Sequence, residues 1–265
     1  MQEEVMGTRT WIAGIALVAT AAATGLTALA VAGTAEASSS SYSLATQTLP
    51  DGRRVVARWN PCQTITYKVN PTLAAGTASQ RSAAVRDVQA AFTRAAAATG
   101  MTFRYAGTTT QVPTGSTWYA QQTTAEIVVA WVNPAKTGYK SSLLGRSGTS
   151  YTAGTGGYAY KFWKSGSAPW TGATGRGFVV LNAQQNSKFT AGFGTGSTRG
   201  ELLLHEIGHS LGLNHVGATS QTMYPTILSR STTAGYGSGD RTGLTKLGAT
   251  QGCISVPGFV WSDLS

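Results

Sequence analysis

Apolar and polar side chains alternate in several short segments of this chain. In residues 63–70, Ile65, Tyr67 and Val69 are separated by polar residues, a spacing that is typical of a strand with one buried face. Residues 177–182 form a nearly continuous apolar run, which favours a short buried strand. Together with two further segments of similar character, they predict a sheet. Those two segments are residues 102–105 and residues 126–132.

A helical spacing appears after the first of these segments. Residues 79–99 carry apolar side chains at intervals of three and four, and Gly100 supplies a stop. The apolar positions are Val85, Val88, Phe92 and Ala95. Residues 138–177 are rich in Gly, Ser, Thr and aromatic residues, so we do not expect them to form a long helix.

Two more helices are predicted in the last third of the chain. The sequence from Thr198 to Glu201 fits the S/T-x-x-E capping box, with Thr198 as the N-cap. Asp240 is placed to cap a short final helix over residues 241–249. Asp240 is therefore interpreted as a structural residue, and metal binding is the less favoured alternative.

The most specific pattern is H-E-x-x-H-x-x-G-x-x-H at residues 205–215, and it contains all three histidines of the chain. His205 and His209 are four residues apart, so a helix places both imidazoles on one face. Glu206 lies on a neighbouring part of the helix surface. From there its carboxylate can reach a metal-bound water without binding the metal itself.

The end of the motif supplies a third ligand. Gly212 permits a left-handed backbone conformation that ends the helix, and the turn brings back His215. Three protein ligands leave the fourth position of a tetrahedral zinc ion open for water, which is the arrangement of a catalytic site. The motif therefore predicts one catalytic zinc ion.

The motif and its flanks resemble the metzincin metalloproteases, and most closely the secreted bacterial matrixin-like peptidases. The resemblance is specific over residues 198–225 and looser over residues 55–255. Residues 221–225, Gln-Thr-Met-Tyr-Pro, look like the Met-turn of that family. This resemblance implies that Met223 forms an apolar floor under the zinc ligands and that Tyr224 is a supporting residue.

Some positions depart from the family pattern. Val216, which follows the third histidine, matches none of the usual residues, and Pro225 stands where some members have a tyrosine. No histidine remains for the second, structural zinc ion that matrixins bind. Calcium is not supported, because the few carboxylates of the chain leave few oxygen ligands for it. The subfamily stays open.

The resemblance implies an α+β fold of the zincin kind. The expected parts are a twisted mixed sheet, a long helix, a metal-binding active-site helix and a C-terminal helix. It also implies a zinc-dependent endopeptidase that cleaves proteins or peptides with a zinc-activated water, for which Glu206 is the general base. Residues 156–160 are interpreted either as the sheet edge that pairs with an extended substrate or as an ordinary strand.

Residues 1–37 have the features of a secretory signal peptide. Arg9 precedes an uncharged stretch over residues 11–32, and residues 35–37, Ala-Glu-Ala, resemble a cleavage site. An uncleaved membrane anchor is the alternative, because the apolar stretch is long. Cleavage predicts a secreted, extracellular protein that keeps no membrane segment.

After cleavage we expect a flexible leader over residues 38–54, followed by one catalytic domain over residues 55–265. The domain is expected to be a monomer. Exported proteins meet oxidising conditions, so Cys62 and Cys253, the two cysteines of the chain, are predicted to form a disulfide.

The charge balance is basic, with 20 Lys and Arg against 10 Asp and Glu and a formal net charge of +10. Residues 1–37 hold one Arg and three Glu, so cleavage raises the net charge to +12. A basic surface favours anionic polymers or acidic substrates as partners. The basic residues are scattered, and no nucleic-acid-binding module is recognisable.

Two other functions stay open at this stage. One is a cationic cell-surface or wall-binding protein that contains zinc but has no proteolytic activity. The other is a zinc hydrolase that acts on a different amide. The intact Glu206 argues against an inactive protein.

Overall fold

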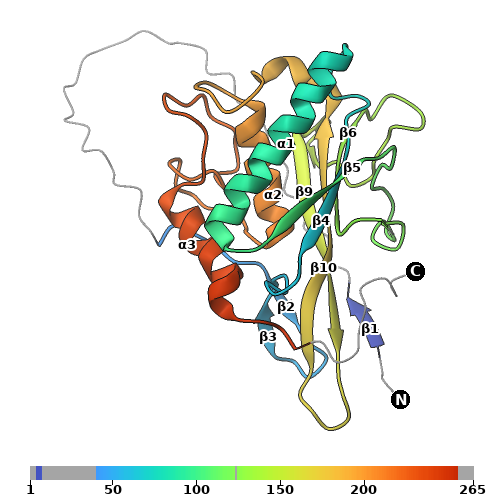
Figure 1. The fold of residues 1–265 in the computed structure, drawn as a ribbon, viewed down its shortest axis with the longest axis vertical. Helices are drawn as coiled ribbons and strands as arrows, with labels where there is room; N and C mark the ends of the chain where they lie inside the picture. Colours follow the sequence, from blue (N-terminus) through green and yellow to red (C-terminus); the bar gives the residue numbers. More distant parts are fainter. Residues whose placement is uncertain (1–3, 8–39, 123, 256–265) are drawn as a thin grey trace, which may run out of the picture.

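The computed structural model describes residues 4–7, 40–122 and 124–255 (Figure 1). Its main sheet has six strands in the order β1-β9-β10-β6-β4-β5. Strands β10, β6, β4 and β5 run parallel to one another, whereas β9 is antiparallel to both β10 and β1. The strands of this sheet are β1 Glu4–Gly7, β4 Ile65–Asn70, β5 Phe103–Thr108, β6 Ile127–Val132, β9 Gly154–Trp163 and β10 Thr171–Asn182.

Smaller elements and helices complete the described part of the chain. Two short antiparallel pairs lie outside the main sheet: β2 Thr46–Thr48 with β3 Arg54–Val56, and β7 Arg146–Ser147 with β8 Ser150–Tyr151. The α-helices are α1 Ala78–Thr99, α2 Arg199–Leu211 and α3 Ser238–Leu247, and the 3-10 helices are η1 Ala183–Lys188 and η2 Ala249–Gln251.

The four predicted strands correspond to β4, β5, β6 and β10, and the predicted long helix corresponds to α1. Helix α1 ends as expected at Gly100, which has a left-handed φ of 69°. Helix α3 begins at Ser238, three residues before the predicted start. The reason is that Asp240 lies within the first turn, where its Oδ2 accepts the Gly237 N–H at 3.1 Å.

Alternate residues of the central strands divide the core into two layers. In β6, Val129 and Trp131 belong to the large cluster beneath α1, α2 and α3. Ala130 and Val132 face the other side of the sheet and pack with Trp118 and neighbouring loop residues. Figure 1 shows α1 running diagonally across the sheet. This two-residue period fixes which face of the sheet carries α2.

The prediction of a flexible leader over residues 38–54 is wrong for its described part. Ala45 and Leu49 are buried with Tyr158 and other aromatic residues of β9. The apolar residues of the leader are few, but they cover the aromatic half of β9. Burial of these side chains explains why the segment packs against the domain.

The structure joins Cys62 to Cys253, as the sequence predicts, with the two Cα atoms 5.3 Å apart. The predicted signal segment lies outside the described residues, apart from residues 4–7. Helices long and apolar enough to span a membrane are absent from the described ranges.

Candidate metal centre

Helix α2 presents the motif because both of its ends are capped. The Thr198 side chain accepts the backbone N–H of Glu201 at 3.1 Å, as predicted for the N-cap. Gly212 ends the helix with a φ of 111°, and its N–H donates to the carbonyls of Gly208 and His209. A Cβ at Gly212 would lie 2.5 Å from the carbonyl oxygen of Ala57, so only glycine fits this turn.

The three histidines meet at one point. The Nε2 atoms of His205 and His209 are 3.1 Å apart, and that of His215 lies 3.1 Å and 3.2 Å from them. His205 is fully buried and His209 is 7% exposed, while His215 is partly buried. Within the described part of the chain, these three residues are the one group of His, Cys, Asp or Glu with the spacing of a metal site.

The backbone fixes the orientation of two of these rings. His205 Nδ1 lies 2.7 Å from the carbonyl oxygen of Thr222, and His209 Nδ1 lies 2.8 Å from that of Leu213. A carbonyl can only accept, so each Nδ1 carries the proton and each Nε2 has a free lone pair. Burial lowers the pKa of His205 well below its usual value and that of His209 to about 3, which keeps both rings neutral.

This arrangement fits a zinc ion. Two unprotonated Nε2 atoms cannot hydrogen-bond to each other, so their close approach needs a cation between them. A tetrahedral zinc ion with Zn–N bonds of about 2.0–2.1 Å holds its ligand nitrogens roughly 3.3 Å apart. The observed separations of 3.1–3.2 Å are close to that value. The Nδ1 contacts are those that a metal-binding histidine normally makes with its second nitrogen.

Glu206 lies beside the histidines as a buried carboxylate. Both of its oxygens are shielded from solvent and have no hydrogen-bond partner among the described residues. Burial raises the pKa of Glu206 well above its ordinary value. A Cβ at Gly154 would lie 2.7 Å from Glu206 Oε1, which places the carboxylate directly against β9.

Met223 packs under the same helix. It is 1% exposed, and a Cβ at Gly208 would lie 2.5 Å from its Sδ atom. The side chain therefore lies against α2 at Gly208, which stands between His205 and His209 in the sequence, as a floor for the ligands would. Tyr224 is half-buried and donates its backbone N–H to Gln221. A supporting role for its phenol stays a prediction.

The turn that carries His215 is held by the N-terminal segment. The Asn214 N–H donates to Ser43 and the Ala45 N–H donates to Gly212, both at 2.8 Å. Leu44 and Leu213 form an antiparallel bridge between these two bonds. Part of the segment expected to be a leader is thus attached to the third-ligand turn, which the sequence pattern did not indicate.

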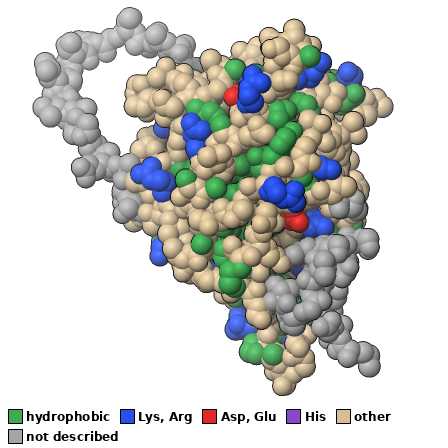
Figure 2. Space-filling model, viewed as in Figure 1, with side chains coloured by type: hydrophobic (Ala, Val, Ile, Leu, Met, Phe, Trp, Pro, Cys, Tyr) green, Lys and Arg blue, Asp and Glu red, His purple; other side chains and the backbone are tan. Residues whose placement is uncertain are grey.

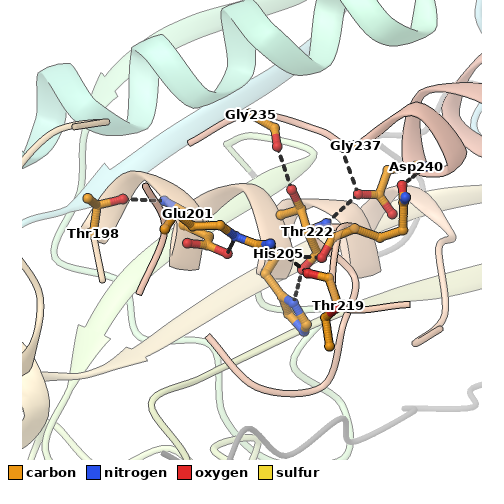
Figure 3. Close-up of polar contacts among 10 residues, drawn as sticks. Thr198, Glu201, His205, Thr219, Thr222, Gly235, Gly237 and Asp240 are labelled. Atoms are coloured by element: carbon orange, nitrogen blue, oxygen red, sulfur yellow. Dashed lines mark hydrogen bonds and ion pairs between the residues drawn. The ribbon is translucent and has the colours of Figure 1, made fainter. Parts of the chain in front are cut away.

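The residues before and inside the Met-turn are held by a polar network (Figure 3). The Thr222 N–H donates to Asp240 Oδ2 at 2.5 Å, and the Thr222 hydroxyl donates to the carbonyl of Gly235 at 2.6 Å. Asp240 thus has the predicted structural role, and it reaches both its own helix and the Met-turn. The sequence had no signal for the second contact.

The Glu201 side chain does not make the hydrogen bond that the predicted capping box implies. In a complete capping box its carboxylate would accept the Thr198 N–H, but Glu201 Oε1 instead accepts from Arg230 Nε at 2.7 Å. A charged donor binds a carboxylate more strongly than a backbone N–H does. Arg230 lies 29 residues further along the chain, and no local sequence pattern connects it with Glu201.

The segment interpreted as a sheet edge, residues 156–160, lies in β9 and is antiparallel to its neighbours. Among the described strands, residues 154–159 pair only with β10, while β1 pairs with Tyr160 to Trp163. β9 also packs directly on α2, as the glycine contacts with Glu206 show. The half of β9 without a second partner strand is therefore the half next to the histidines.

Comparison with known families supports this assignment. The family described as Matrixin (Peptidase_M10) matches residues 163–248, which include the three histidines, Glu206 and Met223. The match supports a metallopeptidase of the matrixin or metzincin type, and the mixed sheet with its helices fits such a fold. A search of curated proteins found no match.

Proposed function

We propose that this chain is a secreted zinc-dependent endopeptidase in which Glu206 is the general base. The observation that carries the proposal is the convergence of the Nε2 atoms of three histidines next to a buried carboxylate with no hydrogen-bond partner among the described residues. This donor set fits one zinc ion with an open position. The Matrixin match supports peptide bonds as the target.

Each residue of the site has a defined task. His205, His209 and His215 hold the metal, and the carbonyls of Thr222 and Leu213 orient two of the rings. When bound, zinc supplies a Lewis acid that polarises a carbonyl and lowers the pKa of water. Glu206 accepts the proton of the attacking water and transfers it to the leaving amine. Burial raises the pKa of Glu206, which makes its carboxylate a stronger base than an exposed one.

Strand β9 is the proposed binding edge for the substrate. A peptide that pairs with residues 154–159 would lie along the strand that contacts Glu206. Backbone pairing of this kind suits extended proteins and peptides of varied sequence. The Lys and Arg side chains on the face drawn in Figure 2 are spread out and acidic side chains are few, which favours acidic substrates or anionic surface polymers.

The test is an assay of casein cleavage by the chain that starts at residue 38. We expect hydrolysis that a chelator abolishes and that added zinc restores. The Glu206→Ala variant, which keeps the three histidines, is the matched control and should bind zinc without cleaving casein. Zinc binding without cleavage by the unaltered protein would contradict the peptidase assignment.

A further inference from the structure

Arg230 makes an unusual set of contacts for a residue outside the motif. Its Nε donates to Glu201 Oε1 at 2.7 Å, while Nη1 and Nη2 donate to the carbonyls of Thr219 and Gln221 at 2.6 Å and 2.9 Å. Its own backbone is held by a bridge to Gly196. One guanidinium therefore ties α2 to the chain between the third ligand and the Met-turn.

Thr222, which follows Gln221, connects this segment to the metal site. The carbonyl of Thr222 accepts from His205 Nδ1 at 2.7 Å, and Asp240 binds the Thr222 N–H from the other side. Figure 3 shows Glu201, Thr219, Thr222 and Asp240 around His205. Arg230 thus holds the carbonyls of Thr219 and Gln221, and Asp240 holds the N–H of Thr222. These contacts fix the segment whose Thr222 carbonyl orients His205.

Burial of the Glu201–Arg230 ion pair costs free energy, because both charges lose contact with water. The Glu201 side chain is 1% exposed and that of Arg230 is 18% exposed, and Glu201 Oε2 is buried with no hydrogen-bond partner in the described part of the chain. A buried ion pair is often no more stabilising than apolar residues of the same volume. Burial also raises the pKa of Glu201 in spite of the nearby Arg230. The negative charge of Glu201 in the first turn suits the dipole of α2, but this does not require Arg230 as its partner.

We propose that the Glu201–Arg230 pair positions the first zinc ligand, by holding residues 219–222 so that the Thr222 carbonyl faces His205 Nδ1. The inference rests on the zinc site proposed above, but not on the reaction that the site carries out. The geometry needs an arginine, because a guanidinium has donors in several fixed directions. A lysine ammonium on its flexible stem does not reproduce that fork.

A second ion pair on the same helix gives a matched control. Arg199, the first residue of α2, binds Asp87 of α1 with Nε–Oδ2 and Nη2–Oδ2 distances of 2.8 Å and 2.5 Å. The side chains of Arg199 and Asp87 are 13% and 15% exposed, so this ion pair is also well shielded from solvent. It links α2 to α1, and the same Asp87 oxygen also accepts the backbone N–H of Gly192.

The experiment measures zinc affinity by competition with a chromophoric chelator, together with the visible absorption spectrum of the cobalt-substituted protein. Arg230→Met and Arg230→Lys should both weaken zinc binding about tenfold, as the loss of outer contacts usually does. Both variants should also change the cobalt spectrum. Arg199→Met should lower the melting temperature while its zinc affinity and spectrum stay those of the unaltered protein.

Three results would overturn the proposal. They are unchanged zinc affinity in Arg230→Met, full recovery of affinity in Arg230→Lys, and an equal loss of affinity in Arg199→Met. If Arg230→Met does not fold, the double variant Glu201→Met/Arg230→Met removes the pair without leaving a lone buried charge. That variant should fold and still bind zinc about tenfold more weakly. Normal zinc affinity with no casein cleavage in the unaltered protein would count against the peptidase proposal alone.

Discussion

Gly156 of β9 lies directly against the backbone carbonyl of Glu206 in α2, and a Cβ at position 156 would overlap that carbonyl. The obstacle is backbone, which cannot rotate away as a side chain does. The glycine therefore sets how closely the metal helix approaches β9. Through this spacing, a residue without a side chain determines where the Glu206 carboxylate lies relative to the strand.

Gly156→Ala should destabilise the protein by about 3 kcal/mol, because the two elements must move apart. For a domain of this size the melting temperature should fall by roughly 6–12 °C. Gly194→Ala is the control, since a Cβ there meets nothing within 4 Å. Calorimetry of both variants checks the prediction, and equal melting temperatures would show that β9 moves freely.

Glu206→Ala should lower the rate of casein cleavage by at least about 10²-fold, the usual contribution of a general base. Zinc content should stay at one ion per chain, because the three histidines are unchanged. The melting temperature should not fall, since the variant removes a buried carboxylate without hydrogen bonds among the described residues. Substantial activity in this variant would rule out Glu206 as the base.

Removal of zinc should lower the melting temperature. At free zinc 1,000-fold above its Kd, binding contributes about 4 kcal/mol, equivalent to roughly 8–16 °C for a domain of this size. His215→Ala should show a smaller shift on addition of a chelator, because it has lost one ligand. Thermal scans with and without chelator measure both effects, and a variant shift equal to that of the unaltered protein would exclude His215 as a ligand.

Loss of the disulfide should be costly, because the two cysteines are 191 residues apart. The chain-entropy model gives a stabilisation of about 5 kcal/mol for a loop of this length. Cys62→Ser/Cys253→Ser and the reduced native protein should therefore melt at similar, lower temperatures. Two reactive thiols in the oxidised native protein would contradict the pairing.

Much of this architecture follows from local rules. The i, i+4 spacing of His205 and His209, the Thr198 cap and the Gly212 turn all act within a few residues, so the sequence alone predicts α2 and its ligands. The same is true of α1, where apolar spacing and Gly100 define the helix. Helix α3 begins three residues before the predicted start, because Asp240 is a first-turn residue rather than the N-cap.

The missed features depend on contacts between distant segments. Arg230 lies in a loop and reaches Glu201 only after the chain has turned back on α2. Ser43 and Ala45 looked like parts of a polar leader, because their hydrogen bonds to the His215 turn use backbone atoms that any residue has. Gly156 carries no side chain, and its role is visible only once β9 lies on Glu206.

The bridge between Leu44 and Leu213 also bears on when the centre can form. Leu44 is among the first residues of the packed domain to be synthesised. Leu213 follows only after most of the domain has been made. Contacts of such high contact order form late, because a long loop must close first. We therefore expect the turn that carries His215 to be fixed late in folding, after the two ends of the packed domain have met.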